Sequence, residues 1–179
     1  DKIKVLRIKM DEESQKPLRE RTPDVRTQWY TNCTNYINLV SSTLKKIGGI
    51  SRNNDLIANY YELIIDTLRF RSIVGNESSI FTSAITRSKT ISKDEYAALL
   101  LLRGESKQVW SDMKNKALMI DSDNLIAVLE TVNDKYYSQF RPNQDRLLEL
   151  ALEGQIYDGA GKEIAKSSVP ALDSILLLA

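Results

Sequence analysis

Apolar residues recur at steps of three and four over most of this chain, and this spacing constrains its fold more than any other feature. Between Thr22 and Gly49 they follow one stripe of an α-helix, whereas a strand would need strict alternation. Thr22-Pro23-Asp24 favours a helix start, and Gly48-Gly49 favours a helix end. The stripe consists of Val25, Trp29, Cys33, Tyr36, Val40, Leu44 and Ile47.

The other segments have the same period and are bounded by helix signals. Ser92 and Glu95 match a capping box, in which each side chain bonds a free amide of the other residue. Arg141-Pro142 either kinks a helix or separates it from a continuation, and Pro170 bends or restarts the last helix. Besides the segment from Thr22, we predict helices over 2–21, from about 51 to about 89, over 92–117, from 121 past 136, over 144–152, and from Gly159-Ala160-Gly161 to 179.

These segments predict an all-α fold, an antiparallel up-down bundle of long helices with short connections, of the four-helix-bundle type. No strand pattern competes, and 7 Gly with 4 Pro are too few for the many turns of a sandwich or barrel. The length of 179 residues fits a single domain, 1–179, or two stacked sub-bundles that share a long helix.

Composition excludes several classes of function. The chain has no His and one Cys, which removes imidazole catalysis, Cys-His nucleophiles, disulfides within the chain and multi-ligand zinc sites. A formal net charge of +1 argues against a nucleic-acid partner. Asp121-Ser122-Asp123-Asn124 lacks the Gly and the final Glu of a calcium loop and is better interpreted as a helix cap. We therefore expect a protein that is not an enzyme and has no cofactor or metal.

Neither end of the sequence indicates a membrane segment. No run approaches the ~20 apolar residues of a spanning helix, and the start lacks the order of a signal peptide. The chain as given is therefore expected to be soluble. Its apolar last residues, 174–179, fit either an excised piece of a longer protein or an ordinary helix end.

The predicted helix from 51 to 89 carries a candidate ligand site. The stripe of Tyr61, Ile65 and Leu68 continues through Ser72, Gly75, Ser79 and Ser83, so an inward face changes from large and apolar to small and polar. Arg69 and Arg71 flank this stripe, and an arginine fork suits a planar anion such as a carboxylate or nitrate. A bound anion would offset the cost of burying such an arginine.

A purely structural interpretation stays open beside this one. Arginines on a helical protein with 27% charged residues are most often solvated and paired with a nearby Asp or Glu. Small residues on an inner face often only let two helices approach closely.

The run from Tyr60 to Glu77, YYELIIDTLRFRSIVGNE, is similar to the core of the bacterial nitrate- and nitrite-sensing (NIT) domain. In that family a Leu-rich helix face ends in a basic residue, followed by a Gly and an acidic residue. A small-residue stretch and a helix start of the type Ser-x-x-Glu-Tyr commonly follow, and this chain has Ser83-Ala84-Ile85 and then Ser92-Lys93-Asp94-Glu95-Tyr96. Trp29 and a later helix with Arg146 also fit, so the resemblance covers roughly residues 20–179.

The resemblance implies a helical sensor module in the periplasmic, extracytoplasmic part of an inner-membrane protein, placed between spanning helices outside this sequence. Its output would be a chemoreceptor, a sensor kinase or a cyclic-dinucleotide enzyme. The implied partners are a small nitrate- or nitrite-like anion and a second copy in a homodimer. Family members commonly have Arg directly after the Gly-x-Glu, where this chain has Ser78, so the resemblance supports the fold more strongly than the ligand. Arg71 is then the best anion contact, followed by Arg69 and Arg146.

Two hypotheses about function follow. In the first, an anion sits among Arg71, Ser72, Gly75 and Ser79 and shifts the long helices. In the second, the bundle senses a periplasmic partner protein through an exposed helix face. Phe70 lies opposite the predicted inward stripe, where an aromatic side chain suits either docking or burial in a second layer or homodimer.

Overall fold

The computed structural model describes residues 2–50, 54–88 and 90–179. These residues are helical almost throughout and contain no strand, so the predicted all-α class is confirmed. The chain divides into two compact units, Asp1–Ile47 and Gly48–Ala179. The predicted helix boundaries at Ser51 and Lys89 lie outside the described residues.

The first unit is a pair of helices. Helix α1 spans Lys2–Gln15, a short 3₁₀ turn spans Leu18–Glu20, and α2 spans Pro23–Ile50, one residue beyond the Gly48-Gly49 pair expected to end it. Where the chain turns back, the backbone amide of Thr22 donates a hydrogen bond of 2.7 Å to Glu13. The Arg7 guanidinium lies 5.9 Å from the centre of the Trp29 ring. None of the seven apolar residues predicted to form the stripe of α2 is buried.

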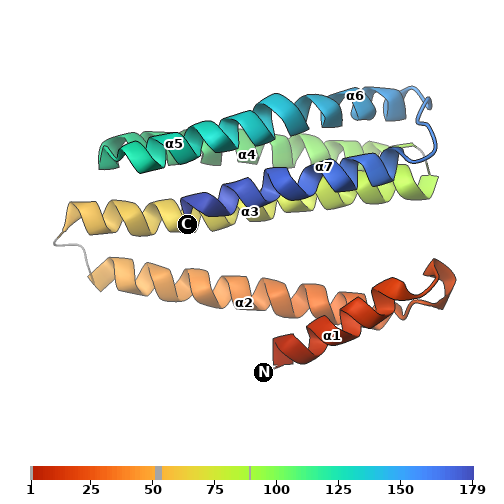
Figure 1. Ribbon diagram of the computed structural model, residues 1–179, viewed down its shortest axis with the longest axis horizontal. Coiled ribbons are helices and arrows are strands. Elements are labelled where there is room, and N and C mark those ends of the chain that lie inside the picture. The colour runs from red at the N-terminus through yellow and green to blue at the C-terminus, as the bar shows by residue number, and fades with distance from the viewer. Residues whose placement is uncertain (1, 51–53, 89) are drawn as a thin grey trace. The chain divides into compact units, whose positions relative to one another are not determined.

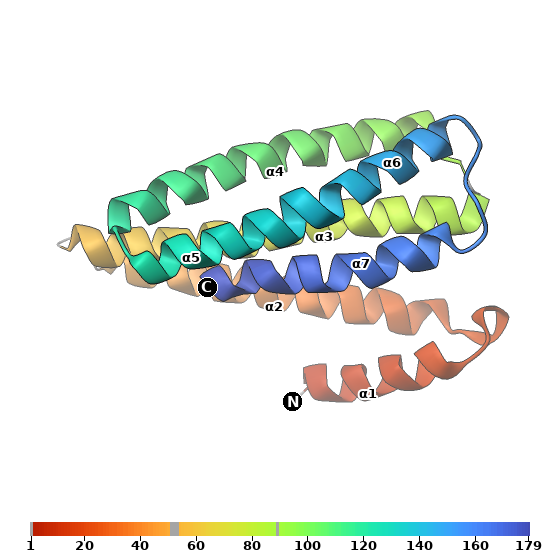
Figure 2. The ribbon, with the colours of Figure 1, turned by 45° about the horizontal axis from the view of Figure 1, so that its top comes forward.

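The second unit is a bundle of four helical rods. The first rod is α3 (Asp55–Ser88) and the second is α4 (Lys93–Ile120). The third joins α5 (Asp123–Val132), the π-helix η2 (Asn133–Phe140) and α6 (Arg141–Leu152), and the fourth joins α7 (Ala160–Ile175) to the 3₁₀ turn η3 (Leu176–Leu178). Figures 1 and 2 show neighbouring rods running in opposite directions, as predicted.

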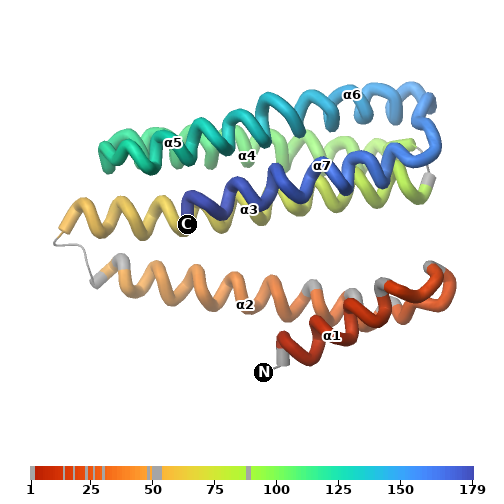
Figure 3. Tube along the Cα trace, in the orientation of Figure 1, coloured from red at the N-terminus to blue at the C-terminus, as the bar shows by residue number. Residues whose placement is uncertain are grey.

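The third rod passes through its proline without a break. Pro142 lies in the first turn of α6, where its missing amide hydrogen is tolerated, and the trace is continuous from α5 to α6 (Figure 3). Pro170 likewise lies inside α7 and does not restart that helix. No helix among the described residues is long and apolar enough to cross a bilayer.

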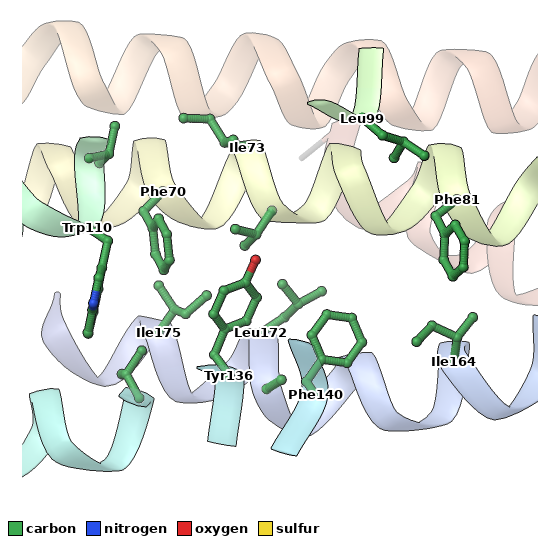
Figure 4. Packing of buried hydrophobic residues seen from close by; sticks show 14 of the residues in the cluster. Phe70, Ile73, Phe81, Leu99, Trp110, Tyr136, Phe140, Ile164, Leu172 and Ile175 are labelled. Atoms are coloured by element: carbon green, nitrogen blue, oxygen red, sulfur yellow. The ribbon is translucent and has the colours of Figure 1, made fainter. Parts of the chain in front are cut away.

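An aromatic cluster fills the centre of the bundle (Figure 4). The ring of Phe70 from α3 stacks on Trp110 from α4 and meets the edge of Tyr136 from η2, with both pairs of ring centres 5.5 Å apart. Phe70 and Tyr136 are completely buried. The bundle therefore has a well-packed core to which at least three of its four rods contribute large side chains.

This packing contradicts the predicted inward face of α3. The buried face contains Leu63, Thr67, Phe70, Val74, Glu77 and Phe81. Ser72, Ser79 and Ser83 are exposed on the described surface, so the small-residue stripe is not an inner face. Phe70, expected opposite the inward stripe as a docking point or buried in a second layer or homodimer, is buried in the core of the bundle itself. Positions 61 and 63 differ by about 200° around a helix, and the bulkier face is the one buried.

The capping box of α4 is a clear local test of this fold. The Ser92 side chain accepts a hydrogen bond from the Glu95 amide at 3.2 Å, and the Glu95 carboxylate accepts one from the Ser92 amide at 2.9 Å. We expect Ser92→Ala to lower the free energy of unfolding by ~1 kcal/mol in urea titrations. Ser122→Ala is the matched control, because Ser122 caps α5 without a side-chain bond. An equal loss in both variants would contradict this assignment.

The same cap predicts a pH dependence. The hydrogen bond from the Ser92 amide, and then the one from its hydroxyl, lower the pKa of Glu95 below its ordinary value of 4.5. A carboxyl whose pKa is lower in the folded chain stabilises the fold above its unfolded-state pKa, and this contribution is lost as the pH falls through the folded-state pKa. The stabilities of the wild type and Glu95→Gln are therefore expected to converge in acid and to differ most near neutral pH.

Candidate functional site

The most unusual feature of the bundle is a carboxylate buried in its core. Glu77 lies on the apolar face of α3, in helical phase with Phe70 and Phe81, and its side chain is only 1% exposed. A carboxylate in such a place is stable only when it is paired and hydrogen-bonded. Two arginines from other rods supply these partners.

Both arginines bind the same oxygen of Glu77. Arg103 of α4 donates from Nε to Glu77 Oε1 at 2.9 Å, and Arg141 at the start of α6 donates to this oxygen from Nη1. The arginine side chains are themselves mostly covered, at 19% and 13% exposed. The carboxylate therefore joins α3, α4 and the third rod at one point.

A second layer of contacts orients the arginines. Arg141 donates from Nη2 to the Tyr136 hydroxyl at 2.5 Å and from Nη1 to Gln144 Oε1 at 2.9 Å. Arg103 Nη2 lies 2.6 Å from Asp145 Oδ1, close enough for an ion pair but without the alignment of a hydrogen bond. Two arginines and two carboxylates thus give this ion network, Glu77, Arg103, Arg141 and Asp145, a net charge of zero. Its centre at Glu77 is buried, and Asp145 lies at its partly exposed edge.

Besides Asp145 Oδ1, two oxygen atoms at the network lack a hydrogen-bond partner. Glu77 Oε2 and the Tyr137 hydroxyl are both buried without a hydrogen bond. Burial raises the pKa of Tyr136 and of Tyr137 although the charge of Arg141 opposes this, so both phenols stay protonated. Burial lowers the pKa of Arg141, but its interactions with Tyr136 and Glu77 outweigh this effect and raise the pKa overall. Both arginines of the network are therefore already neutralised by the protein's own carboxylates.

Arg71 differs from the network arginines. It is half-buried, and its Nε is covered without a hydrogen-bond acceptor. Burial lowers the pKa of Arg71, and the charge of Asp173 on α7 offsets only part of this shift. The guanidinium folds back over Gly75, because a Cβ placed on that glycine would lie 2.8 Å from Arg71 Nη1. Of the site residues predicted from the sequence, the structure thus places Arg71 beside Gly75.

The other predicted site residues do not join them. Arg69, Ser72 and Ser79 are exposed. Arg146 is occupied elsewhere, donating to Glu163 Oε1 at 3.0 Å and to Asn143 Oδ1 at 2.9 Å. Glu163 and Asp173 are ten residues apart on α7, which is ~15 Å along a helix, so Arg146 and Arg71 belong to separate places on the bundle.

Sequence analysis missed the ion network, although one signal was available. Glu77 follows Phe70 by seven residues and precedes Phe81 by four, so it shares their helix face. A carboxylate on a bulky apolar stripe predicts a buried ion pair. The partners Arg103 and Arg141 could not be identified in this way, because only the packing of the rods brings them to Glu77.

No group of three or more metal-ligating side chains occurs in the described ranges. Comparisons of the chain with protein-family models, curated proteins and solved structures found no match. The resemblance to the NIT domain therefore stays a prediction.

The network predicts a large effect when Glu77 is lost. Glu77→Ala leaves Arg141 without a carboxylate in the core and Arg103 with only Asp145, so we expect the free energy of unfolding to fall by ~3–5 kcal/mol in urea titrations. Glu163→Ala breaks an exposed pair with Arg146 and is the matched control, with a far smaller expected loss. Equal losses would show that Glu77 contributes no more than a surface carboxylate.

The space left in Glu77→Ala also gives a rescue test within the same prediction. Formate or acetate fits the two arginine forks and should raise the unfolding temperature of this variant in proportion to the logarithm of its concentration. Sodium chloride at equal ionic strength controls for screening, and the wild type controls for binding elsewhere. A rise of the same size in the wild type would contradict rescue at the network.

Proposed function

We propose that this chain is a ligand-binding sensor domain, without catalytic activity, of a bacterial signal-transduction receptor. It binds a small nitrate- or nitrite-like anion beside α3 and transmits a helix shift. The domain belongs to the extracytoplasmic part of an inner-membrane protein and works as a homodimer. The resemblance of residues 60–77 to the NIT domain supports the location, the dimer and the class of ligand.

The observation that carries the proposal is the environment of the Arg71 guanidinium, whose buried Nε has no hydrogen-bond acceptor. Arg103 and Arg141 each have a carboxylate in direct contact, whereas Arg71 Nε is buried without an acceptor. A desolvated arginine without a partner is costly, and a planar anion that accepts from Nε and Nη would remove this cost. The absence of a side chain at Gly75 leaves room for the guanidinium to lie close to the helix.

Asp173 gives the proposal a route from binding to signalling. Its carboxylate on α7 is the charge that attracts Arg71 in the ligand-free protein. A bound anion replaces part of this attraction and so weakens the electrostatic tie between α3 and α7. Binding can shift the bundle only if the two states bind the anion unequally, and this exchange of partners supplies the difference.

Arg71→Ala tests the proposal directly. Loss of a charged hydrogen-bond donor is worth ~1.5–3 kcal/mol, so the affinity for nitrate, nitrite or a small carboxylate should fall at least tenfold in calorimetry. Arg69→Ala removes an exposed arginine two residues away and should bind as the wild type does. If the folded wild type binds none of these anions, small-anion sensing at this site is wrong.

A glycine pair provides a second, milder comparison. Gly75→Ala forces the Arg71 guanidinium to move, whereas Gly104→Ala places a methyl group where no atom lies within 4 Å. Both changes improve helix propensity by a similar amount. Only Gly75→Ala is expected to alter anion affinity.

One observation favours recognition of a partner protein as a second candidate function. The first turns of α3 form an apolar groove lined by Ile57, Tyr60, Tyr61 and Ile64, and Ile57 and Tyr60 are at least 40% exposed. This groove replaces Phe70 as the docking point, since Phe70 is buried. Partner binding there would persist in Arg71→Ala and be lost in Tyr60→Glu, which separates the two functions.

A further inference from the structure

The π-helix η2 is stabilised by contacts that only its own geometry permits. In an α-helix, residues five apart lie about 140° apart around the axis, so their side chains cannot meet. Two side chains in η2, and that of Arg141 directly after it, bond the residue five positions earlier. Gln139 donates to Asp134 at 2.8 Å, Ser138 donates to the Asn133 carbonyl at 3.4 Å, and Arg141 donates to the Tyr136 hydroxyl at 2.5 Å.

The backbone follows the same spacing where η2 meets α6. The Arg141 amide donates to the Tyr136 carbonyl, five residues earlier, in place of the usual four. Relative to a regular α-helix, η2 therefore holds surplus chain. The wider turn lets Tyr136 and Arg141 both reach the core, where Arg141 binds Glu77.

This arrangement ties the helix type to the ion network. If η2 became α-helical, Arg141 would turn away from Tyr136 by about 140° and could not bind both Tyr136 and Glu77. Conversely, the ion pair between Glu77 and Arg141 stabilises the π-helix, because Arg141 reaches Glu77 only when η2 has this geometry. The described contacts of Arg141 with Tyr136, Glu77 and Gln144 all hold it in this position.

Pro142 is a position to which the extra residue of the π-helix can move as a bulge. Proline has no amide hydrogen, so the ladder of helix hydrogen bonds is already interrupted immediately after Arg141. A bulge that leaves 133–140 can stop at Pro142 without disturbing the buried residues further along α6, Gln144, Leu147, Leu148 and Ala151.

We propose that Asn133–Phe140 is a two-state element of the bundle. It is π-helical while Arg141 is held by Glu77 and Tyr136. When either contact is lost, it converts to an α-helix, the bulge moves to Pro142, and Arg141 leaves the core. The element thereby couples the ion network on α3 and α4 to rotation of the first turn of α6. Neither state requires an anion at Arg71.

Hydrogen exchange of the backbone amides tests this with a conservative pair of variants. Tyr136→Phe removes the hydroxyl that Arg141 binds, so one of the contacts that hold the π-helix is lost. Amides 134–141 are then expected to exchange about tenfold faster or more. Tyr137→Phe is the control: it removes a neighbouring buried hydroxyl that has no hydrogen-bond partner, so exchange should stay unchanged. Equal exchange in both variants and the wild type would overturn the proposal, as would equal acceleration in both.

Deletion of Ser138 tests the surplus chain itself. Ser138 is exposed, and its loss places Tyr136 and Arg141 four residues apart, where a regular α-helix brings them together. We expect this protein to fold, with slow exchange over the segment that Tyr136→Phe no longer accelerates. Deletion of Glu149, an exposed residue of regular α6, is the control and should destabilise the bundle. A Ser138 deletion that fails to fold, or that keeps the full effect of Tyr136→Phe, would overturn the proposal.

Discussion

The arrangement of the rods in the bundle depends on one carboxylate that is buried away from water. Glu77 is stable in the core only because Arg103 and Arg141 reach it from two other rods, and this requirement fixes how those rods sit against α3. Apolar contacts alone would tolerate small slips of one helix along another, since they have no direction. The ion network does not tolerate them, because each slip would expose an unpaired charge to hydrocarbon. It therefore selects one arrangement among several that would bury a similar area.

The arginines of the ion network and Arg71 differ in how their charge is balanced. Within the network the charges cancel, so Arg103 and Arg141 attract an external anion only weakly. Arg71 has only the incomplete attraction of Asp173, so it is the arginine that an anion would benefit most. The convergence of Arg103 and Arg141 is not by itself the mark of an anion site, because Glu77 already occupies the position between them.

Periodicity predicted the helices well because each rod repeats its apolar residues over many turns. It failed at α3, where both faces carry apolar residues in the first half, and Tyr61, Ile65 and Leu68 indicated a face that continues into exposed serines. The bulky residues Phe70 and Phe81 decide burial, since they remove more apolar surface from water. The π-helix could not be predicted from steps of three and four residues, because its signal is a five-residue spacing of polar side chains. Of the proposed anion site, only the meeting of Arg71 and Gly75, four residues apart on one helix, follows from local geometry.

The distribution of tryptophan has a practical consequence. Trp110 is stacked in the aromatic cluster of Gly48–Ala179, and Trp29 lies in the helix pair of Asp1–Ile47. Each compact unit thus contains one tryptophan. Trp110 is buried, and Trp29 is partly exposed to solvent. The tryptophan fluorescence of the chain is therefore the sum of the emission from Trp29 and from Trp110. Replacing Trp29 with Phe leaves the emission of Trp110, which reports on the bundle alone.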